Sequence, residues 1–132
     1  MRKKYFLKKI FRAYPLELNY FIKPNDGISY YPLLGVEHDA EVSSTITFLA
    51  QFFLDCFIDI GANIGLISLN VGDDFKKVIC IEPNPIVCNI LRTNTALNGN
   101  NFEIHELGIG STSEVIDLYI PQKPRRCLYI KK

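Results

Sequence analysis

The segment FIDIGANIG, at residues 57–65, decides the fold. It continues a short, nearly unbroken apolar run at 56–60, which is typical of a parallel β-strand buried on both faces. Gly61 and Gly65 follow, and then the apolar segment 66–71. Glycine permits a sharp turn and lets a helix pack closely on the preceding strand. The segment therefore predicts a strand, a glycine turn and a helix in succession.

The same order of elements continues downstream. Residues 77–81 form a second apolar run, and residues 86–97 have a helical pattern. Asn84 is suited to cap that helix, and Pro85 to occupy its first position. With a third strand over 102–107, this alternation predicts an α/β fold, a doubly wound, Rossmann-like parallel sheet with right-handed crossovers.

The segments on either side of this unit are less regular. Residues 16–23 and 28–34 are β-prone and are joined by the turn sequence PNDG at 24–27, which predicts an N-terminal β-hairpin. A helix is predicted over 39–54, with Asp39 as its cap.

A fourth, antiparallel strand is predicted over 114–120, because its connection to the third strand is short. We divide the chain into a basic N-terminal segment with the hairpin, residues 1–38, and the main domain, residues 39–132.

Charge is distributed unevenly over the 132 residues. Residues 1–12 carry six basic and no acidic side chains, residues 13–122 carry four basic and fourteen acidic ones, and residues 123–132 carry five basic and none acidic. An acidic body argues against nucleic acid as the main partner, because phosphate binding needs a basic surface.

The aromatic and basic residues of 1–12 leave two interpretations open: a peripheral contact with an anionic membrane surface, or a solvated helix docked by its aromatic face. No apolar run is long enough to span a bilayer, and no secretory signal is recognisable. We therefore expect a cytoplasmic protein, with peripheral membrane contact as an option.

The four cysteines are Cys56, Cys80, Cys88 and Cys127. They form no C-x-x-C pair, and no histidine lies near them at zinc-binding spacing. We expect buried, reduced thiols and no metal site.

The informative polar residues come at the ends of the first two strands. In a doubly wound sheet, ligands bind outside the carboxyl ends of the strands. Asp59 could orient the glycine turn or accept a hydrogen bond from a ligand ammonium, and the helix that follows the turn offers free N–H groups. Glu82 lies about 20 residues beyond the turn, where such folds place a carboxylate on ribose hydroxyls. The predicted cofactor residues here are Asp59, Gly61, Ala62, Asn63, Gly65, Glu82 and Pro83.

The glycine spacing discriminates between adenosine-containing cofactors. Dinucleotide-binding turns read G-x-G-x-x-G, whereas this turn reads G-A-N-I-G and lacks the second glycine. Asn63 would crowd a pyrophosphate, which S-adenosylmethionine does not contain. The pattern therefore favours S-adenosylmethionine over NAD. The alternative is that Asp59, Asn63 and Glu82 only cap helices.

The motifs D-x-G-A-N-x-G at 59–65 and E-P-x-P at 82–85, with Asn94 and Asn98 in TNTALN, resemble the FkbM-type family of class I methyltransferases. The resemblance implies that Asp59 and the glycine turn surround the methionine part of S-adenosylmethionine and that Glu82 holds the ribose. It also implies an upstream glutamate at the site, Glu41 or else Glu37. Family members resemble O-methyltransferases acting on hydroxyls of sugars, glycolipids or natural products.

The chain departs from this family after Ile120. Members continue with a further parallel strand of the K-x-D-x-E-G type, and no such motif follows here. We therefore expect a sheet that is incomplete at the C-terminus, with an unpaired edge on the first strand. A truncated product, a fragment, and a half that needs a partner chain or a second copy are all compatible with this.

The sequence identifies no general base. His38 lies in a segment that could border the cofactor cleft, whereas a surface or packing role is expected for His105. Three functions stay open: an S-adenosylmethionine-dependent methyltransferase or its cofactor-binding part, a non-catalytic relic or interaction module, and a NAD-dependent oxidoreductase, which the glycine spacing disfavours.

Overall fold

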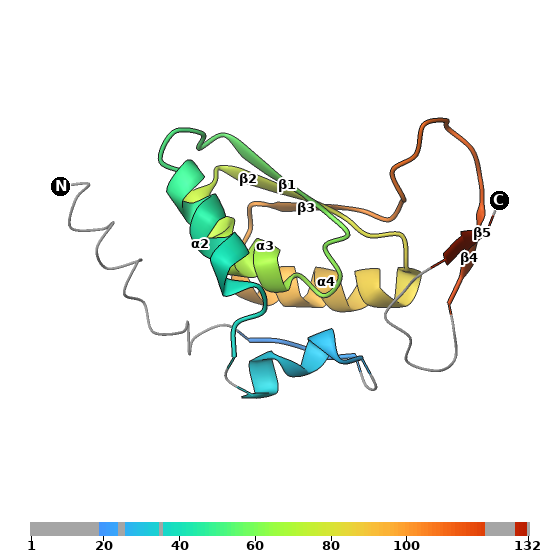
Figure 1. Cartoon of the computed structure of the whole chain (residues 1–132), viewed down its shortest axis with the longest axis horizontal. Helices are drawn as coiled ribbons and strands as arrows, with labels where there is room; N and C mark the ends of the chain where they lie inside the picture. The colour runs from blue at the N-terminus through green and yellow to red at the C-terminus, as the bar shows by residue number, and fades with distance from the viewer. Residues whose placement is uncertain (1–18, 24–25, 35, 121–128, 132) are drawn as a thin grey trace.

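A three-stranded parallel sheet lies at the centre of the molecule (Figure 1). The structure is a computed structural model, and it describes residues 19–23, 26–34, 36–120 and 129–131. The strands are β1 (Cys56–Ile60), β2 (Lys77–Ile81) and β3 (Phe102–His105), in the order β1-β2-β3. Within the described residues β1 is therefore an edge strand.

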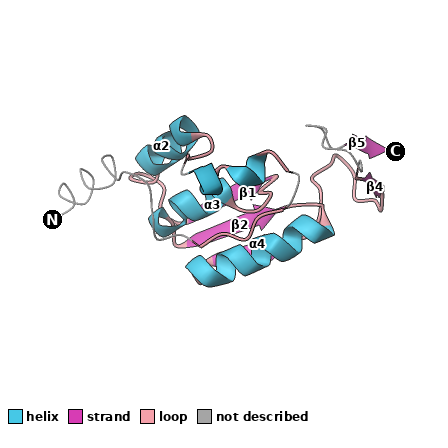
Figure 2. Cartoon of the chain, turned by 90° about the horizontal axis from the view of Figure 1, so that it is seen from below, coloured by secondary structure: helices cyan, strands magenta, loops and turns pink. Residues whose placement is uncertain are grey.

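The two crossover helices lie on one face of the sheet (Figures 1 and 2). Helix α3 (Leu66–Val71), followed by the short η3 (Gly72–Asp74), joins β1 to β2, and α4 (Pro85–Asn98) joins β2 to β3. Right-handed crossovers that progress in one direction place both helices on the same side. This confirms the predicted α/β class and gives part of a Rossmann-like sheet.

Alternation along the strands separates a covered face from an open one. On the covered face Val78, Cys80 and Leu91 form a buried cluster with Ala62, against which four aromatic and aliphatic residues pack: Phe57, Phe75, Phe102 and Ile104. The register places Ile58 opposite Ile79 and Ile60 opposite Ile81 on the other face. Because no helix of the described residues covers that face, Ile58 and Ile60 are 55% and 66% exposed.

The predicted N-terminal hairpin is wrong where the structure describes it. Residues 28–34, expected as a strand, form two 3-10 helices, η1 (Ile28–Tyr30) and η2 (Pro32–Leu34). The carboxylate of Asp26 accepts hydrogen bonds from Ile28 N (3.3 Å) and from Ser29 Oγ (3.1 Å). Such bonds favour a tight turn over a strand ladder. Pro32 also lacks the N–H that a strand ladder needs.

Helix α2 (Ala40–Leu49) is shorter than the predicted 39–54 and contacts α3. Asp39 is at the predicted start, but its backbone is left-handed (φ 52°) and its side chain makes no capping hydrogen bond. The cap of α4 is confirmed, since Asn84 Oδ1 accepts from Ile86 N at 3.1 Å.

The third and fourth strands differ from expectation in length and pairing. Strand β3 ends at His105 rather than at residue 107. The fourth strand, β4 (Asp117–Tyr119), covers only part of the predicted 114–120. It does not pair with β3, as the short connection led us to expect, but pairs antiparallel with β5 (Tyr129–Lys131) in a separate two-stranded sheet. The basic stretch 1–12 lies outside the described residues.

In the described part of the chain, no helix combines the length and apolarity needed to cross a bilayer. Cys80 and Cys88 are buried and free, as expected. The prediction of a buried thiol is wrong for Cys56, which is exposed on the open face at the edge of the sheet.

Candidate functional site

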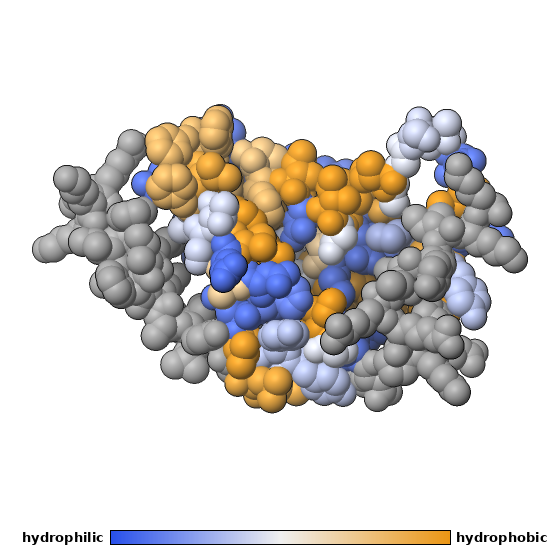
Figure 3. All heavy atoms as spheres, viewed as in Figure 1, coloured by the Kyte–Doolittle hydropathy of each residue, from blue (hydrophilic) through white to orange (hydrophobic). Residues whose placement is uncertain are grey.

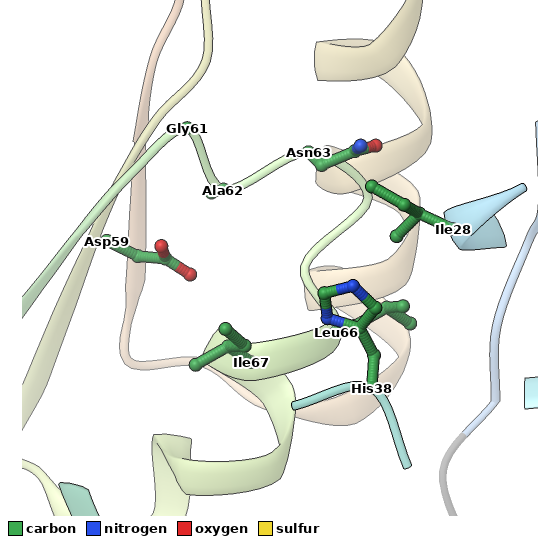
Figure 4. A pocket seen from close by; sticks show the side chains of 8 residues that line it. All are labelled: Ile28, His38, Asp59, Gly61, Ala62, Asn63, Leu66 and Ile67. Atoms are coloured by element: carbon green, nitrogen blue, oxygen red, sulfur yellow. The ribbon is translucent and has the colours of Figure 1, made fainter. Parts of the chain in front are cut away.

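A hollow of about 100 Å³ lies at the carboxyl end of β1 (Figure 4). Asp59 enters it from the strand, and the turn that follows β1 forms its roof. The opposite wall comes from α3 and from the segment before α2. The eight lining residues are Ile28, His38, Asp59, Gly61, Ala62, Asn63, Leu66 and Ile67.

The turn at 61–65 has left-handed backbone at three of its five positions. The φ angles are 82° at Gly61, 52° at Asn63 and 93° at Gly65. Asparagine tolerates this region better than most residues. A Cβ on Gly65 would also lie 2.8 Å from Leu91 Cδ1, so glycine is needed there for close packing of the turn on α4.

Most N–H groups of this turn are used within the protein. Gly61 N and Ala62 N donate to Ile81 O at 2.8 and 3.1 Å, and Gly65 N donates to Ala62 O at 2.9 Å. Asn63 N donates to Glu82 Oε2 at 3.1 Å. A turn that cradles a pyrophosphate presents such groups to the ligand instead. This turn is therefore poorly suited to bind phosphate.

Asp59 belongs to a short hydrogen-bonded chain beneath the turn. Ser68 Oγ donates to Asp59 Oδ2, and Cys80 Sγ donates to Ser68 Oγ at 3.3 Å. Burial raises the pKa of Asp59 above its ordinary value of 3.8, although the bond from Ser68 opposes this. Burial likewise raises the pKa of the Cys80 thiol to about 11. The thiol therefore stays protonated at neutral pH and acts as a donor.

Glu82 ties the two strand-end loops together. Its side chain is only 4% exposed, and its oxygens accept from Asn63 N at 3.1 Å and from Asn84 N at 2.9 Å. Cys88 Sγ donates to its carbonyl oxygen at 3.0 Å. Glu82 does not line the hollow. Its carboxylate keeps further lone pairs, but the residue is almost fully buried.

Asn63 contributes an unsatisfied acceptor. Its side-chain Oδ1 is buried and has no hydrogen-bond partner among the described residues. A buried polar atom without a partner is unfavourable by roughly 1–3 kcal/mol. Both Asn63 and Asp59 line the hollow, but Figure 4 shows the Asn63 side chain directed away from Asp59, so the carboxylate of Asp59 is the oxygen acceptor that faces a ligand there.

His38 is the imidazole on the wall of the hollow (Figure 4). Its Nδ1 lies 3.3 Å from Asp39 Oδ2, and its ring packs edge-on against Tyr31 with centroids 4.9 Å apart. A carboxylate near one ring nitrogen can orient an imidazole, and the same kind of pairing occurs at His105. His38 and Ile28 precede residue 39, so the N-terminal segment takes part in the site.

The other predicted residues lie away from the hollow. Glu41 is exposed in the first turn of α2, whereas Glu37 Oε1 accepts from Asn70 Nδ2 at 3.2 Å. Pro83 is half-buried after Glu82. His105 pairs with Glu103 at 2.7 Å, as expected of a surface residue.

Sequence reasoning missed the apolar wall and Ser68. Leu66 and Ile67 are ordinary helix residues in the sequence, and Ile28 was assigned to the hairpin. Only the position of Ser68 on α3, facing the covered side of β1, could have indicated its bond to Asp59. No cluster of three or more potential metal ligands occurs in the part of the chain that the structure describes.

Comparisons with known proteins give a limited result. No family model matches the chain, and no curated protein matches it. Among solved structures, one from Pyrococcus horikoshii, described as a putative RNA methyltransferase, is similar with a TM-score of 0.45 and 19% identity. The match covers 80% of this chain and 50% of that one, so this chain spans about half the length of that protein.

Proposed function

We propose that this chain is the cofactor-binding part of an S-adenosylmethionine-dependent methyltransferase of the FkbM type. The substrate class that we propose is a hydroxyl group on a sugar, a glycolipid or another natural product. The acidic stretch 13–122, with four basic and fourteen acidic residues, makes a nucleic acid an unsuitable acceptor.

The single observation that carries the proposal is the state of the turn at 61–65. Its N–H groups at Gly61, Ala62, Asn63 and Gly65 are used internally, while the carboxylate of Asp59 faces the hollow. This arrangement suits an ammonium donor rather than a pyrophosphate. The methionine end of S-adenosylmethionine carries such an ammonium, and NAD does not.

The residues present fit part of that cofactor. Pockets for ligands of this size have volumes of roughly 300 Å³ or more, whereas this hollow has about 100 Å³. The hollow can therefore take only a small part of the cofactor, and we propose that this part is the ammonium end of the methionine, with the adenosine beyond it. The adenosine would lie toward Glu82, whose carboxylate could accept from the ribose once Asn63 N is displaced.

The cofactor supplies the methyl group on a sulfonium, and the protein supplies binding and orientation. Asp59 would hold the ammonium, and Leu66 and Ile67 would exclude water from one wall. His38 is the described residue best placed to take a proton from an acceptor hydroxyl, with Asp39 holding Nδ1.

The test is a calorimetric titration of the full chain with S-adenosylhomocysteine. We expect saturable binding that Asp59→Asn weakens about tenfold, because a charge-assisted bond is lost. Asp59 is the better choice than Glu82, whose removal would also release both loops. NAD is the control ligand and should not bind.

Absence of S-adenosylhomocysteine binding by the folded chain would contradict the proposal. Binding of NAD in its place would favour the oxidoreductase. Binding that Asp59→Asn leaves unchanged would move the cofactor away from this hollow.

A further inference from the structure

Asn94, in the middle of α4, joins three parts of the chain that are distant in sequence. Its side chain is 0% exposed. Nδ2 donates to Ile64 O at 2.8 Å and to Phe21 O at 3.1 Å, and Oδ1 accepts from Phe21 N at 2.6 Å. One side chain thus connects α4, the turn that roofs the hollow and the N-terminal segment.

Asn98, one helical turn later, extends this connection outward. Its Oδ1 accepts from Asn19 N at 2.9 Å, and its Nδ2 donates to Asn19 O at 2.7 Å. Residues 19 and 21 are two apart in the chain, and the two asparagines are four apart on a helix, so within the segment 19–21 each asparagine satisfies one backbone N–H and one C=O. Asn98 does not bond to the turn, which distinguishes it from Asn94.

The segment held in this way supplies one wall of the hollow. Tyr20 and Tyr31 pack against the buried cluster of Ile64, Leu66 and Val87. Tyr20 OH also donates to Asn70 Oδ1 at 3.3 Å. Further along the same segment, Ile28 and His38 line the hollow opposite the turn (Figure 4).

We propose that Asn94 is a positioning residue for the cofactor hollow. It keeps the N-terminal wall of the hollow, to which Ile28 and His38 belong, at a fixed position relative to the turn at 61–65. It touches no ligand. It acts because the carbonyl of Ile64 in the turn and the backbone of Phe21 in the wall segment share one buried amide. The ligand part of this inference rests on the proposed function.

The first measurement is S-adenosylhomocysteine affinity in the full chain carrying Asn94→Ala. We expect affinity to fall about tenfold, because a loosened wall must be ordered again on binding. The matched control is Asn101→Ala. Asn101 Nδ2 also donates to two carbonyls, Gly72 O at 2.9 Å and Phe75 O at 3.0 Å, but near the amino end of β3 and away from the hollow. Its affinity should stay within about twofold of the unmodified chain.

The second measurement is amide hydrogen exchange without ligand, which does not depend on the proposed function. Asn94→Ala should speed exchange both in residues 26–38 and at the turn. Asn98→Ala should speed it in residues 19–23 and leave the turn unchanged. Asn101→Ala should do neither.

The outcomes are distinguishable. Equal losses of thermal stability in Asn94→Ala and Asn101→Ala, with no difference in affinity or in exchange at 26–38, would reduce Asn94 to an ordinary structural residue and overturn the inference. If the unmodified chain does not bind S-adenosylhomocysteine, the proposed function fails, and the exchange pattern alone decides on the positioning role.

Discussion

Gly61 and Gly65 have similar left-handed φ angles, 82° and 93°, but different surroundings. A Cβ on Gly61 meets nothing within 4 Å among the described residues, whereas one on Gly65 would lie 2.8 Å from Leu91 Cδ1. Left-handed backbone costs an L-residue about 1–2 kcal/mol. We expect Gly61→Ala to lower the free energy of unfolding by that amount, and Gly65→Ala by about 2–4 kcal/mol, since overpacking adds to it.

Urea denaturation measures this difference. Gly27→Ala is the control, because Gly27 has an ordinary φ of −61° and open space around its Cα. The free energy of unfolding of the Gly27→Ala variant should not fall. Similar losses in Gly61→Ala and Gly65→Ala would contradict the packing of the turn on Leu91.

Asp59 makes stability depend on pH in a direction that its burial fixes. Its pKa in the folded chain is raised above the ordinary 3.8, so protonation favours the folded state. The contribution of this group is therefore fully present below pH 3.8 and is lost as the pH rises through the raised pKa. At neutral pH the buried carboxylate destabilises the fold.

We expect Asp59→Asn to raise the melting temperature at pH 7, because the amide oxygen can still accept from Ser68 and carries no charge. Thermal melts at pH 3.5 and pH 7 check this, and the gain should shrink at the lower pH. A variant that is less stable than the unmodified chain at pH 7 would be incompatible with a desolvated Asp59. The same variant should bind S-adenosylhomocysteine more weakly. Such a result would show that the charge of Asp59, which lowers stability, contributes to ligand binding.

At the scale of elements, the first turn of α4 depends on Asn84. Its side chain accepts from Ile86 N, and the residue is buried. We expect Asn84→Ala to lower the free energy of unfolding by about 1–2 kcal/mol. Asn89→Ala is the control on the same helix, since its side chain makes only an exposed bond with Arg92. Urea denaturation that finds equal effects at both positions would exclude a specific capping role.

The elements that the sequence predicts well are those that local signals define. The predicted bounds match β1, α3 and β2 at both ends, over residues 56–60, 66–71 and 77–81. Glycines and apolar runs determine the local structure of residues close to them in the sequence, so these elements can be predicted without knowing the fold. Residues 28–34 were missed because their bonds to Asp26 compete with strand pairing. The extended segment at 19–23 pairs with asparagine side chains of α4 rather than with another strand, and no local pattern indicates that.

The site was predictable only in part for the same reason. Their position at the carboxyl end of β1 indicates that Asp59 and the turn line a hollow, since parallel strands share one carboxyl edge. Glu82 was expected to face a ligand from its place in the sequence. Only the folded chain reveals that the backbone amides of Asn63 and Asn84 occupy its oxygens.

At the scale of the whole molecule, apolar side chains gather along the top of Figure 3, over β1 and α2. Ile58 and Ile60 of β1 are more than half exposed, as are Phe48 of α2 and Phe52 and Phe53 after it. β1 is also the edge of the described sheet. An apolar edge strand is a template for pairing with another chain, and a lysine on such an edge opposes it.

We therefore expect the chain to self-associate, with a sedimentation coefficient that rises with concentration, and Ile58→Lys to reduce this association. The control is Val115→Lys, which introduces the same charge at a fully exposed position outside the three-stranded sheet. It should associate like the unmodified chain.

If both lysine variants dissociate equally, net charge rather than the β1 edge governs association. If only Ile58→Lys becomes monomeric, the open face is the surface that a second copy or a partner chain would cover. Because Asp59 lies on the same strand, facing the hollow, S-adenosylhomocysteine affinity should then rise with association in the unmodified chain and not in the Ile58→Lys variant.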